Sequence, residues 1–385
     1  MTSVRETTPV RVLVAPDSFK GSLSASLVAA SIAAGVRAAI PGCVVVEAPI
    51  ADGGEGSASA IAQGLQGKWD EVEAVDANGK PVAVPFAACH SPALGPFAVF
   101  DVAEIVGLPA AVAPPGARTT RGVGQAIRAI HDRGFGTIAL GLGGSSTNDA
   151  GAGLLAELAF VCRDGAGAPL DPVFDNLGRV RVLERRRGSE WLQGLRLIGL
   201  TDVTSPLTGA DGASMVFGPQ KGFQDPAAAD AVLAHFADCC AALLGRDLRE
   251  AAGSGAAGGL GFAVALLGGV LRPGAAFVLE AHRLVAGAVD YDWVITGEGR
   301  SDRQTLLGKG PAEVARLARA SGIPVTLLSG AVDSDAQLEA AFDGGCFSIQ
   351  PGPVSLAYAM ENAEQLLQRA GRQVGALFSR ARRAT

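Results

Sequence analysis

The chain has 385 residues, of which 48% are hydrophobic but only 5% aromatic, and its formal net charge is −6. This length predicts two domains, with cores built from Ala, Val, Leu and Ile. The negative charge and the scattered arginines argue against nucleic acid as a partner. No apolar run reaches the roughly 20 residues of a membrane span, and the N-terminus lacks the apolar segment of a signal peptide. We therefore expect a soluble, cytoplasmic protein with no membrane partner.

The cysteines and histidines show no pattern of a metal site or a nucleophilic centre. There is no CxxC pair and no Cys/His spacing typical of zinc, so we expect the six cysteines to be reduced core residues. None of the four histidines is an obvious catalytic base. The cysteines are Cys43, Cys89, Cys162, Cys239, Cys240 and Cys346.

Short aliphatic runs alternate with longer Ala- and Leu-rich helical patterns, which predicts an α/β fold with mainly parallel sheets. Strands are expected at residues 10–15, 44–48, 98–102, 137–141, 196–200, 292–296 and 324–328. Helices are expected at 24–39, 57–65, 122–133, 151–158, 225–244, 311–320 and 355–382. Ligands of open α/β sheets bind at the carboxyl ends of the strands. Because most of these strands end in Gly- and Asp-rich loops, we expect the loops to share one functional edge.

The first and the last third of the chain have the same organisation, since both carry strand–loop–helix units with acidic loops. This predicts a discontinuous α/β domain of residues 1–85 plus 288–385, and a second α/β domain of residues 86–287 inserted within it. We expect the active-site cleft to lie between the two domains.

Two acidic loops follow the first two predicted strands. The first carries Asp17 and Lys20 before Ser24, which can cap the following helix. Backbone N–H groups at a helix N-terminus attract anions, and Lys20 would add a positive charge. The second loop, ADGGEG, carries Asp52 and Glu55 among glycines. Ordinary turns would explain both loops, but two carboxylates in one short turn favour a functional role.

The loop after residues 137–141 is the richest in polar groups. Its glycines expose N–H groups, while hydroxyl, amide and carboxylate side chains supply further donors and a metal ligand. This combination predicts a phosphate cradle. Its residues are Gly143, Gly144, Ser145, Ser146, Thr147, Asn148 and Asp149.

Three further segments carry weaker signals. Asp202 holds the end of strand 196–200, and Lys221 could reach an anion, although a solvated turn is the favoured reading. The segment GSGAAG at 253–258 fits G-x-G-x-x-G, but no strand precedes it, so we reject a dinucleotide fingerprint. A nucleotide-facing loop and tight helix packing remain as alternatives for it.

The last loop, after residues 292–296, carries Glu298, Asp302 and Lys309. It offers two carboxylates and a cation. It is not a P-loop, because Lys309 is followed by Gly rather than Ser or Thr, and Arg303 occupies the place of the first glycine. A nucleotide would have to be bound by a loop of a different kind from a P-loop.

Taken together, these segments resemble the ordered motif series of the glycerate kinase family, over residues 10 to about 370. The motifs are APDSFKGSLSA (15–25), PIADGGEGS (49–57), GGSSTNDAGAG (143–153), DVTSPLTG (202–209), FGPQKG (217–222), GSGAAGGLG (253–261) and ITGEGRSDRQTLLGKGP (295–311). The departures from the family pattern are small: Ser146, Ala150, Ser205 and Ser301.

The resemblance implies a phosphotransferase with an alcohol acceptor, using ATP and Mg²⁺ to phosphorylate D-glycerate and releasing ADP. The product in this family is generally 2-phosphoglycerate, while other glycerate kinases make 3-phosphoglycerate. A kinase for another small hydroxy acid, or a non-catalytic two-domain ligand-binding protein, are the alternatives. Both a monomer and a homodimer are compatible with the sequence.

Phosphoryl transfer requires charge neutralisation, positioning and a proton acceptor. We expect Asp17, ahead of Asp149, to accept the proton, with Lys20 as a catalytic cation. The expected substrate-binding residues are Ser18, Phe19, Asp52, Glu55 and Lys309. The expected nucleotide-binding residues are Gly143, Gly144, Ser145, Ser146, Thr147, Asn148, Gly255, Gly258 and Gly259. The expected metal ligands are Asp202, Glu298 and Asp302.

Overall fold

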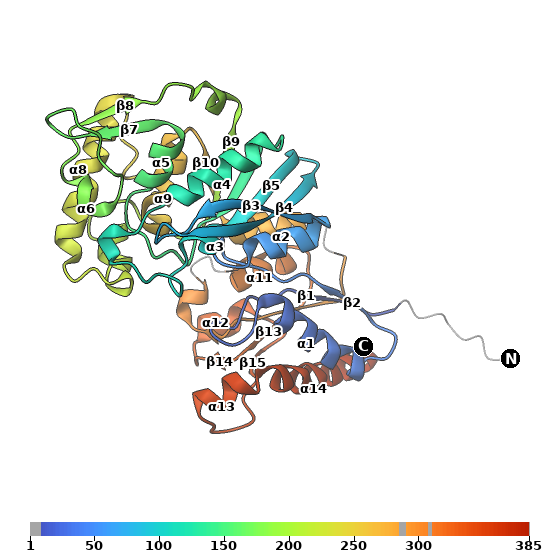
Figure 1. The fold of residues 1–385 in the computed structure, drawn as a ribbon. Helices are drawn as coiled ribbons and strands as arrows, with labels where there is room; N and C mark the ends of the chain where they lie inside the picture. Colours follow the sequence, from blue (N-terminus) through green and yellow to red (C-terminus); the bar gives the residue numbers. More distant parts are fainter. Residues whose placement is uncertain (1–8, 285–289, 307–309, 385) are drawn as a thin grey trace. The chain divides into compact units, whose positions relative to one another are not determined.

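The computed structural model describes residues 9–284, 290–306 and 310–384. The chain divides into two compact units (Figure 1): unit 1 comprises Met1–Asp52 and Ala275–Thr385, and unit 2 comprises Gly53–Gly274. The expected boundary after residue 85 falls inside strand β4 (Pro81–Ser91), which pairs with strands on both of its sides. The compact unit therefore begins about 30 residues earlier than expected, at Gly53.

Unit 1 is built on a five-stranded sheet in the order β15-β13-β11-β1-β2, in which all neighbouring strands are parallel. The carboxyl ends of all five strands therefore lie at one edge of the sheet. The strands are β1 (Arg11–Val14), β2 (Val44–Glu47), β11 (Trp293–Thr296), β13 (Val325–Ser329) and β15 (Cys346–Ser348). A second small sheet pairs β12 (Arg300–Ser301) with β14 (Ala331–Val332).

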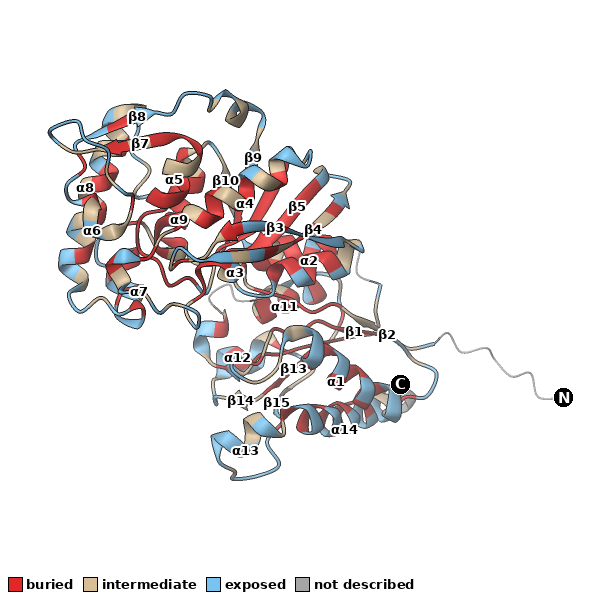
Figure 2. Ribbon diagram, in the orientation of Figure 1, coloured by how far each residue is buried: buried red, intermediate tan, exposed pale blue. Residues whose placement is uncertain are grey.

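Helices α1 (Ala25–Ala39) and α14 (Ala363–Ala384) pack side by side on one face of this sheet, and α11 (Gly310–Ala320) lies on the other (Figure 1). Two glycines allow α1 and α14 to approach closely. A Cβ atom on Gly35 would lie 2.2 Å from the Gln368 carbonyl oxygen, and one on Gly371 would lie 2.7 Å from that of Ile32. Both helices carry buried and exposed segments (Figure 2), and buried residues such as Ile32 of α1 and Leu367 of α14 belong to one core.

The rest of unit 1 consists of short elements around the sheet. They are α10 (Gly274–Ala281), which begins on the last residue of unit 2, the 3₁₀ turn η4 (Arg303–Leu306), α12 (Ala336–Ala341) and α13 (Leu356–Glu361). The single helix expected over residues 355–382 is two helices, α13 and α14, with Asn362 between them.

Unit 2 contains a six-stranded sheet in the order β10-β9-β6-β5-β4-β3. Its first four strands are parallel, and β4 and β3 are antiparallel to their neighbours. The strands are β3 (Lys68–Val75), β4, β5 (Gly95–Asp101), β6 (Thr137–Gly141), β9 (Arg196–Leu200) and β10 (Val270–Arg272). Strands β7 (Phe160–Arg163) and β8 (Val182–Arg185) form a separate antiparallel pair.

The helices of unit 2 connect these strands. The α-helices are α2 (Ser57–Leu65), α3 (Ala103–Val106), α4 (Arg121–Asp132), α5 (Ala152–Leu158), α6 (Phe174–Leu177), α7 (Ala213–Phe217), α8 (Pro226–Leu244) and α9 (Ala256–Leu266). The 3₁₀ turns are η1 (Pro115–Ala117), η2 (Glu190–Gly194) and η3 (Pro219–Lys221).

Helix α8 is the one helix in the described part of the chain that is long and apolar enough to cross a membrane. A single helix of this kind is weak evidence for a span. Leu233, Phe236 and Cys240 of α8 are buried in the core of unit 2, which accounts for their apolar character without a bilayer.

All seven strands expected from the sequence are present, and the mixed α/β fold is confirmed. The expectation missed the other strands, which are β3, β4, β7, β8, β10, β12, β14 and β15. The outer strand β3 (KWDEVEAV) was missed because it exposes most of its polar residues and reads as a loop. All six cysteines are free thiols, but only Cys89, Cys162 and Cys240 are buried.

Candidate active site

Three carboxylates follow neighbouring strands at the carboxyl edge of the unit 1 sheet. Asp17 follows β1, Asp52 follows β2 and Glu298 follows β11. Backbone hydrogen bonds from Asp17 N–H to Gly297 O (2.8 Å) and from Ile50 N–H to Pro16 O (2.9 Å) continue the strand pairing into these loops. We call Asp17, Asp52 and Glu298 the acidic cluster. The parallel strand order brings it together from segments up to 281 residues apart in the chain.

Asp17 has the most perturbed environment of the three. Its side chain is nearly buried, and the Ser18 N–H donates to Oδ1 at 2.6 Å. Burial, followed by the charge of Asp52, raises the pKa of Asp17 to about 7, with a smaller raising effect from Glu298. A carboxylate with a pKa near the working pH is suited to act as a general base.

Lys20 supplies a positive charge beside the acidic cluster. Its Nζ lies 3.5 Å from Asp52 Oδ2, and its side chain is 80% exposed. The charge of Asp52 raises the pKa of Lys20. An exposed ion pair of this length contributes little to stability, so the ammonium group can turn toward an anionic ligand.

The neighbours of Lys20 have unequal roles in this loop. The side chain of Phe19 is buried in the core beneath the sheet, which does not fit the expected contact with substrate. Its backbone pairs with Leu23 and closes the turn that presents Lys20. Ser18 is half-buried beside Asp17.

Glu298 and Asp302 occupy the loop after β11. Glu298 is buried, and its Oε1 accepts hydrogen bonds from Thr305 Oγ1 at 2.6 Å and Ser301 Oγ at 3.4 Å. Asp302 Oδ1 accepts the Gln304 N–H at 2.8 Å at the start of η4. Lys309, expected to bind substrate, lies outside the described residues. Within the described ranges, no group of three His, Cys, Asp or Glu side chains has metal-site geometry.

In unit 2, the first residues of the polar loop after β6 are accessible to solvent, and the later ones are buried. Gly143 is half-buried and Gly144 is exposed with a φ of +67°, whereas Ser146, Thr147 and Asn148 are buried. A Cβ atom on Gly143 would lie 2.4 Å from Gly54 Cα, so the close approach of the two loops requires glycine. Of the six residues expected to bind nucleotide here, Gly143 and Gly144 are at least partly exposed, and the four that follow them are buried.

Two buried basic side chains support this loop. Lys221 Nζ donates to Ser145 Oγ at 3.0 Å and to Thr147 O at 2.8 Å, and Arg118 donates to Ser146 O and Lys221 O. Lys221 is therefore not the solvated turn residue favoured from the sequence. Burial lowers the pKa of Lys221 to about 7. The sequence analysis did not single out Arg118, and no motif marked it.

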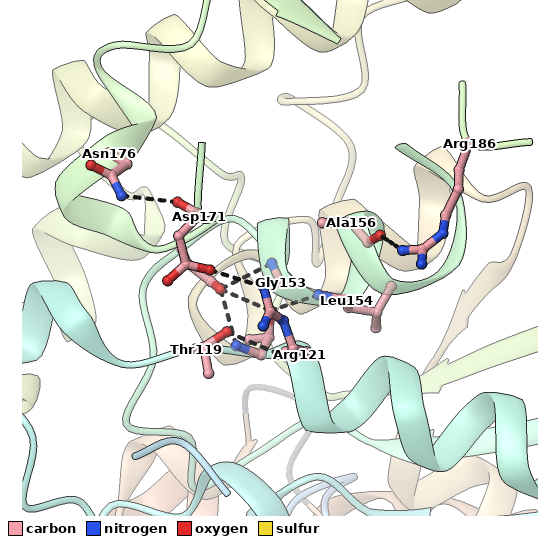
Figure 3. A network of polar contacts seen from close by, with 10 residues as sticks. Thr119, Arg121, Gly153, Leu154, Ala156, Asp171, Asn176 and Arg186 are labelled. Carbon is pink, nitrogen blue, oxygen red and sulfur yellow. Dashed lines mark hydrogen bonds and ion pairs between the residues drawn. The ribbon is translucent and has the colours of Figure 1, made fainter. Parts of the chain in front are cut away.

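Asp149 is fully buried at the start of α5. Its carboxylate accepts hydrogen bonds from Thr120 N–H and Oγ1 and from the N–H groups of Gly151 and Gly153. Gly153 and Leu154 lie beside the first turn of α4 (Figure 3). Burial raises the pKa of Asp149, while these donors act in the opposite direction. Four donors make Asp149 a capping group, which argues against the proton-acceptor role considered for it.

The glycines expected to face the nucleotide at the start of α9 are buried against backbone. A Cβ atom would lie 2.1 Å from Pro206 O on Gly255, 2.0 Å from Thr147 O on Gly258 and 2.4 Å from Ala150 Cα on Gly259. Backbone contact of this kind excludes every larger residue. Of the two alternatives for this segment, the geometry favours tight packing.

Three further acidic residues of unit 2 lie in or next to loops that follow strands or precede helices: Asp202, Glu55 and Asp101. Asp202 Oδ1 accepts the Gly274 N–H at 2.8 Å, and Glu55 is exposed. Asp101, which the sequence analysis missed, accepts the N–H groups of Gly56 at 2.8 Å and Ala58 at 3.0 Å. Burial raises the pKa of Asp101 to about 7. Its place at the end of a predicted strand was the signal that could have identified it.

Comparison with known proteins identifies a family for this arrangement. The model of the glycerate kinase family matches residues 12–379. A "Glycerate kinase" of Bacillus subtilis (strain 168) is 37% identical over 379 residues, covering 95% of this chain and 97% of that protein. A "Glycerate 2-kinase" of Escherichia coli (strain K12) is 33% identical, covering 96% and 98%.

A solved structure agrees with these sequence relatives. A crystal structure assigned to glycerate kinase 2 of Salmonella typhimurium LT2 has a TM-score of 0.82 and 35% identity, covering 98% of this chain and all of that one. The ordered motifs, the fold and the relatives agree over nearly the full length. The chain is therefore an enzyme that belongs to the glycerate kinase family.

Proposed function

We propose that this enzyme transfers the γ-phosphoryl group of ATP to a hydroxyl group of D-glycerate. We favour 2-phosphoglycerate as the product, with 3-phosphoglycerate as the alternative, because a relative carries the name glycerate 2-kinase. The observation that carries the proposal is the buried Asp17 carboxyl, whose pKa of about 7 suits a proton acceptor, beside the exposed cation of Lys20. An acid–base group and a carboxylate-binding group in one loop match the two ends of a hydroxy acid.

In the proposed reaction the glycerate carboxylate binds Lys20, and the reacting hydroxyl lies against Asp17. The hydroxyl oxygen forms a bond to the γ-phosphorus while the bond to the β,γ-bridging oxygen breaks, and ADP leaves. The hydroxyl proton passes to Asp17. Ser18 and Asp52 adjoin this position, and Asp52 pairs with Lys20 when no anionic ligand is bound. Such a reaction depends mainly on positioning and on neutralising charge.

For the nucleotide, we propose that Gly143, Gly144 and Ser145 contact the phosphates. Glycine N–H groups favour negatively charged oxygens where the backbone is accessible. Lys221 helps to fix the position of Ser145, because its Nζ donates to Ser145 Oγ at 3.0 Å. Thr147 and Asn148 are too buried to contribute a direct contact in this arrangement.

For Mg²⁺, we propose Glu298 and Asp302 as ligands, and we keep Asp202 as the third candidate from the sequence. Mg²⁺ in kinases commonly uses one or two carboxylates together with water and substrate phosphates. Carboxylate oxygens are hard donors of the kind that Mg²⁺ takes, so the side chains of Glu298 and Asp302 are chemically suited to it. Bound Mg²⁺ would neutralise charge on the phosphate oxygens. We also propose a cytoplasmic location.

A coupled ADP-release assay with Mg·ATP tests this function. D-glycerate should give turnover well above that with L-glycerate, glycolate or D-lactate, and NMR of the product should place the phosphate on O2. Faster turnover with a different hydroxy acid would support the alternative kinase. Absence of ADP release with every acceptor would support a ligand-binding protein instead.

A further inference from the structure

A chain of buried hydroxyl groups surrounds Glu298 within unit 1. Ser301, Thr305 and Ser329 are each completely buried. Thr305 Oγ1 lies 2.6 Å from Glu298 Oε1, Ser301 Oγ lies 3.4 Å from the same oxygen, and Ser301 Oγ lies 2.8 Å from Ser329 Oγ. Two hydroxyls of the loop after β11 therefore contact the Glu298 carboxylate directly, and Ser329 of β13 supports one of them, Ser301.

The donors in this network have defined directions. A carboxylate oxygen only accepts, so Thr305 must donate its single hydroxyl proton to Glu298. Thr305 Oγ1 in turn accepts the N–H of Asp302 at 3.1 Å. Ser329 Oγ accepts the N–H of Glu298 at 3.2 Å, which leaves its own proton for Ser301. Ser301 can then donate to Glu298 Oε1.

Thr305 thus joins the two acidic residues of the loop. It receives a hydrogen bond from the backbone of Asp302 and gives one to the side chain of Glu298, while its own N–H donates to Asp302 O at 3.0 Å. A side chain that only filled the core would need no hydroxyl at this position. A short hydrogen bond to a charged acceptor in a buried setting holds that acceptor firmly.

We propose that Thr305 is a positioning residue that fixes Glu298 and the Asp302 turn as one unit for binding the divalent cation. This inference rests on the proposed function, since it assigns Thr305 to the same site. Thr305 itself does not touch the cation or the substrate. Its hydroxyl orients the Glu298 carboxylate, which in turn would bind the cation. Loss of a residue that orients a metal ligand in this way commonly costs about 10–100-fold in metal affinity or activity.

Thr305→Val and Thr305→Ser form a matched pair for the test. Valine keeps the shape of threonine but lacks the hydroxyl, whereas serine keeps the hydroxyl and lacks the methyl group. Mn²⁺ serves as the probe, and its binding in the presence of ADP is followed by the EPR signal of free Mn²⁺. This readout needs no glycerate and no turnover.

We expect Thr305→Val to weaken Mn²⁺ binding about tenfold and to lower kcat by a similar factor, with KM for D-glycerate within about twofold. Thr305→Ser should restore Mn²⁺ affinity close to that of the natural chain. Equal losses in both variants, or unchanged Mn²⁺ affinity in Thr305→Val, would overturn the proposal. So would absence of Mn²⁺ binding by the natural chain.

A substitute variant and an activity measurement distinguish failure of this inference from misfolding and from failure of the proposed function. If Thr305→Val does not fold, judged by circular dichroism, Thr305→Ala takes its place with the same expected loss. If the natural chain binds Mn²⁺ but releases no ADP with D-glycerate, the proposed function fails. The Mn²⁺ comparison still decides the role of Thr305.

Discussion

Asp17 and Asp52 follow adjacent parallel strands, and the charge of Asp52 is the largest influence after burial that raises the pKa of Asp17 to about 7. The pairing of β1 with β2 brings these carboxyls to the same edge of the sheet, although they lie 35 positions apart in sequence. Two like charges that share a partly desolvated site favour protonation of one of them. Asp17, the more buried, is that one.

The pH dependence of activity should follow Asp17. Only its ionised form can accept the hydroxyl proton, so kcat/KM should rise with pH through an apparent pKa near 7 and level off above it. Initial rates of ADP release between pH 5.5 and 9 measure this limb, with a second buffer series as control. A flat profile across this range would contradict the assignment of Asp17.

Replacing Asp17 by Asn should lower activity and raise stability. The loss of the proton acceptor should reduce kcat by about 10²–10⁴-fold. Because the pKa of Asp17 is higher in the folded state, the folded chain binds more protons between about pH 4 and 7, and the stability that Asp17 contributes is lost as pH rises across this window.

Asn does not ionise, so at pH 8 the Asp17→Asn variant should be more stable by roughly 2–4 kcal/mol. Thermal unfolding at pH 4 and pH 8 measures the difference, which should be small at pH 4. The exposed Asp211 provides a control, since Asp211→Asn should change neither property. Equal stabilities of the natural chain and Asp17→Asn at pH 8 would contradict the burial of a charge at residue 17.

Asp149→Asn should destabilise unit 2 without removing the proton acceptor. Asn retains one acceptor oxygen, whereas Asp149 uses both oxygens for four donors. Leaving buried donors unpaired costs about 1–3 kcal/mol. Chemical denaturation should show this loss, while kcat per folded enzyme below the transition stays within about threefold. A 10²-fold fall in kcat with unchanged stability would restore Asp149 as a catalytic candidate.

Lys221→Met should destabilise the chain in a pH-dependent manner. Thr147 O and Ser145 Oγ lose a donor, at a cost of about 1–3 kcal/mol. Because burial lowers the pKa of Lys221 to about 7, the unfolded chain binds more protons above pH 7, and the natural chain gains stability from Lys221 as pH rises from 7 toward 10.

The difference between the natural chain and Lys221→Met should therefore be larger at pH 9 than at pH 7. Urea unfolding at both values measures it, with the exposed Lys68→Met as the matched control. A difference that shrinks at pH 9 would show that the ammonium form of Lys221 is the stabilising one.

Gly258→Ala and Gly245→Ala separate backbone clash from backbone strain. Both glycines have a φ of +69°, but a Cβ atom on Gly258 would lie 2.0 Å from Thr147 O, whereas one on Gly245 meets nothing within 4 Å. Gly245→Ala should cost about 1–2 kcal/mol, and Gly258→Ala about 3 kcal/mol or more. Denaturation midpoints measure both costs. A Gly258→Ala variant of normal stability with a raised KM for ATP would instead support direct nucleotide contact.

Local sequence patterns predicted much of the architecture. Aliphatic runs such as VRVLVA and DWVIT mark buried parallel strands, because such strands are covered on both faces and need no polar residues. The same reasoning failed for β3, whose polar side faces outward. It also placed a domain boundary inside β4, because pairing between strands is not encoded in any one strand.

The sequence by itself identified which loops are chemically unusual, because runs of Gly, Asp and Ser after predicted strands can be read directly from it. Only the tertiary structure decided what each residue does there. Burial and neighbouring charge distinguish Asp17, with a raised pKa beside Asp52, from Asp149, which four donors hold at the start of a helix. Lys221, expected at the surface, is instead buried and donates hydrogen bonds to Ser145 Oγ and Thr147 O. Solvation and charge depend on residues distant in sequence, and the fold alone brings those residues together.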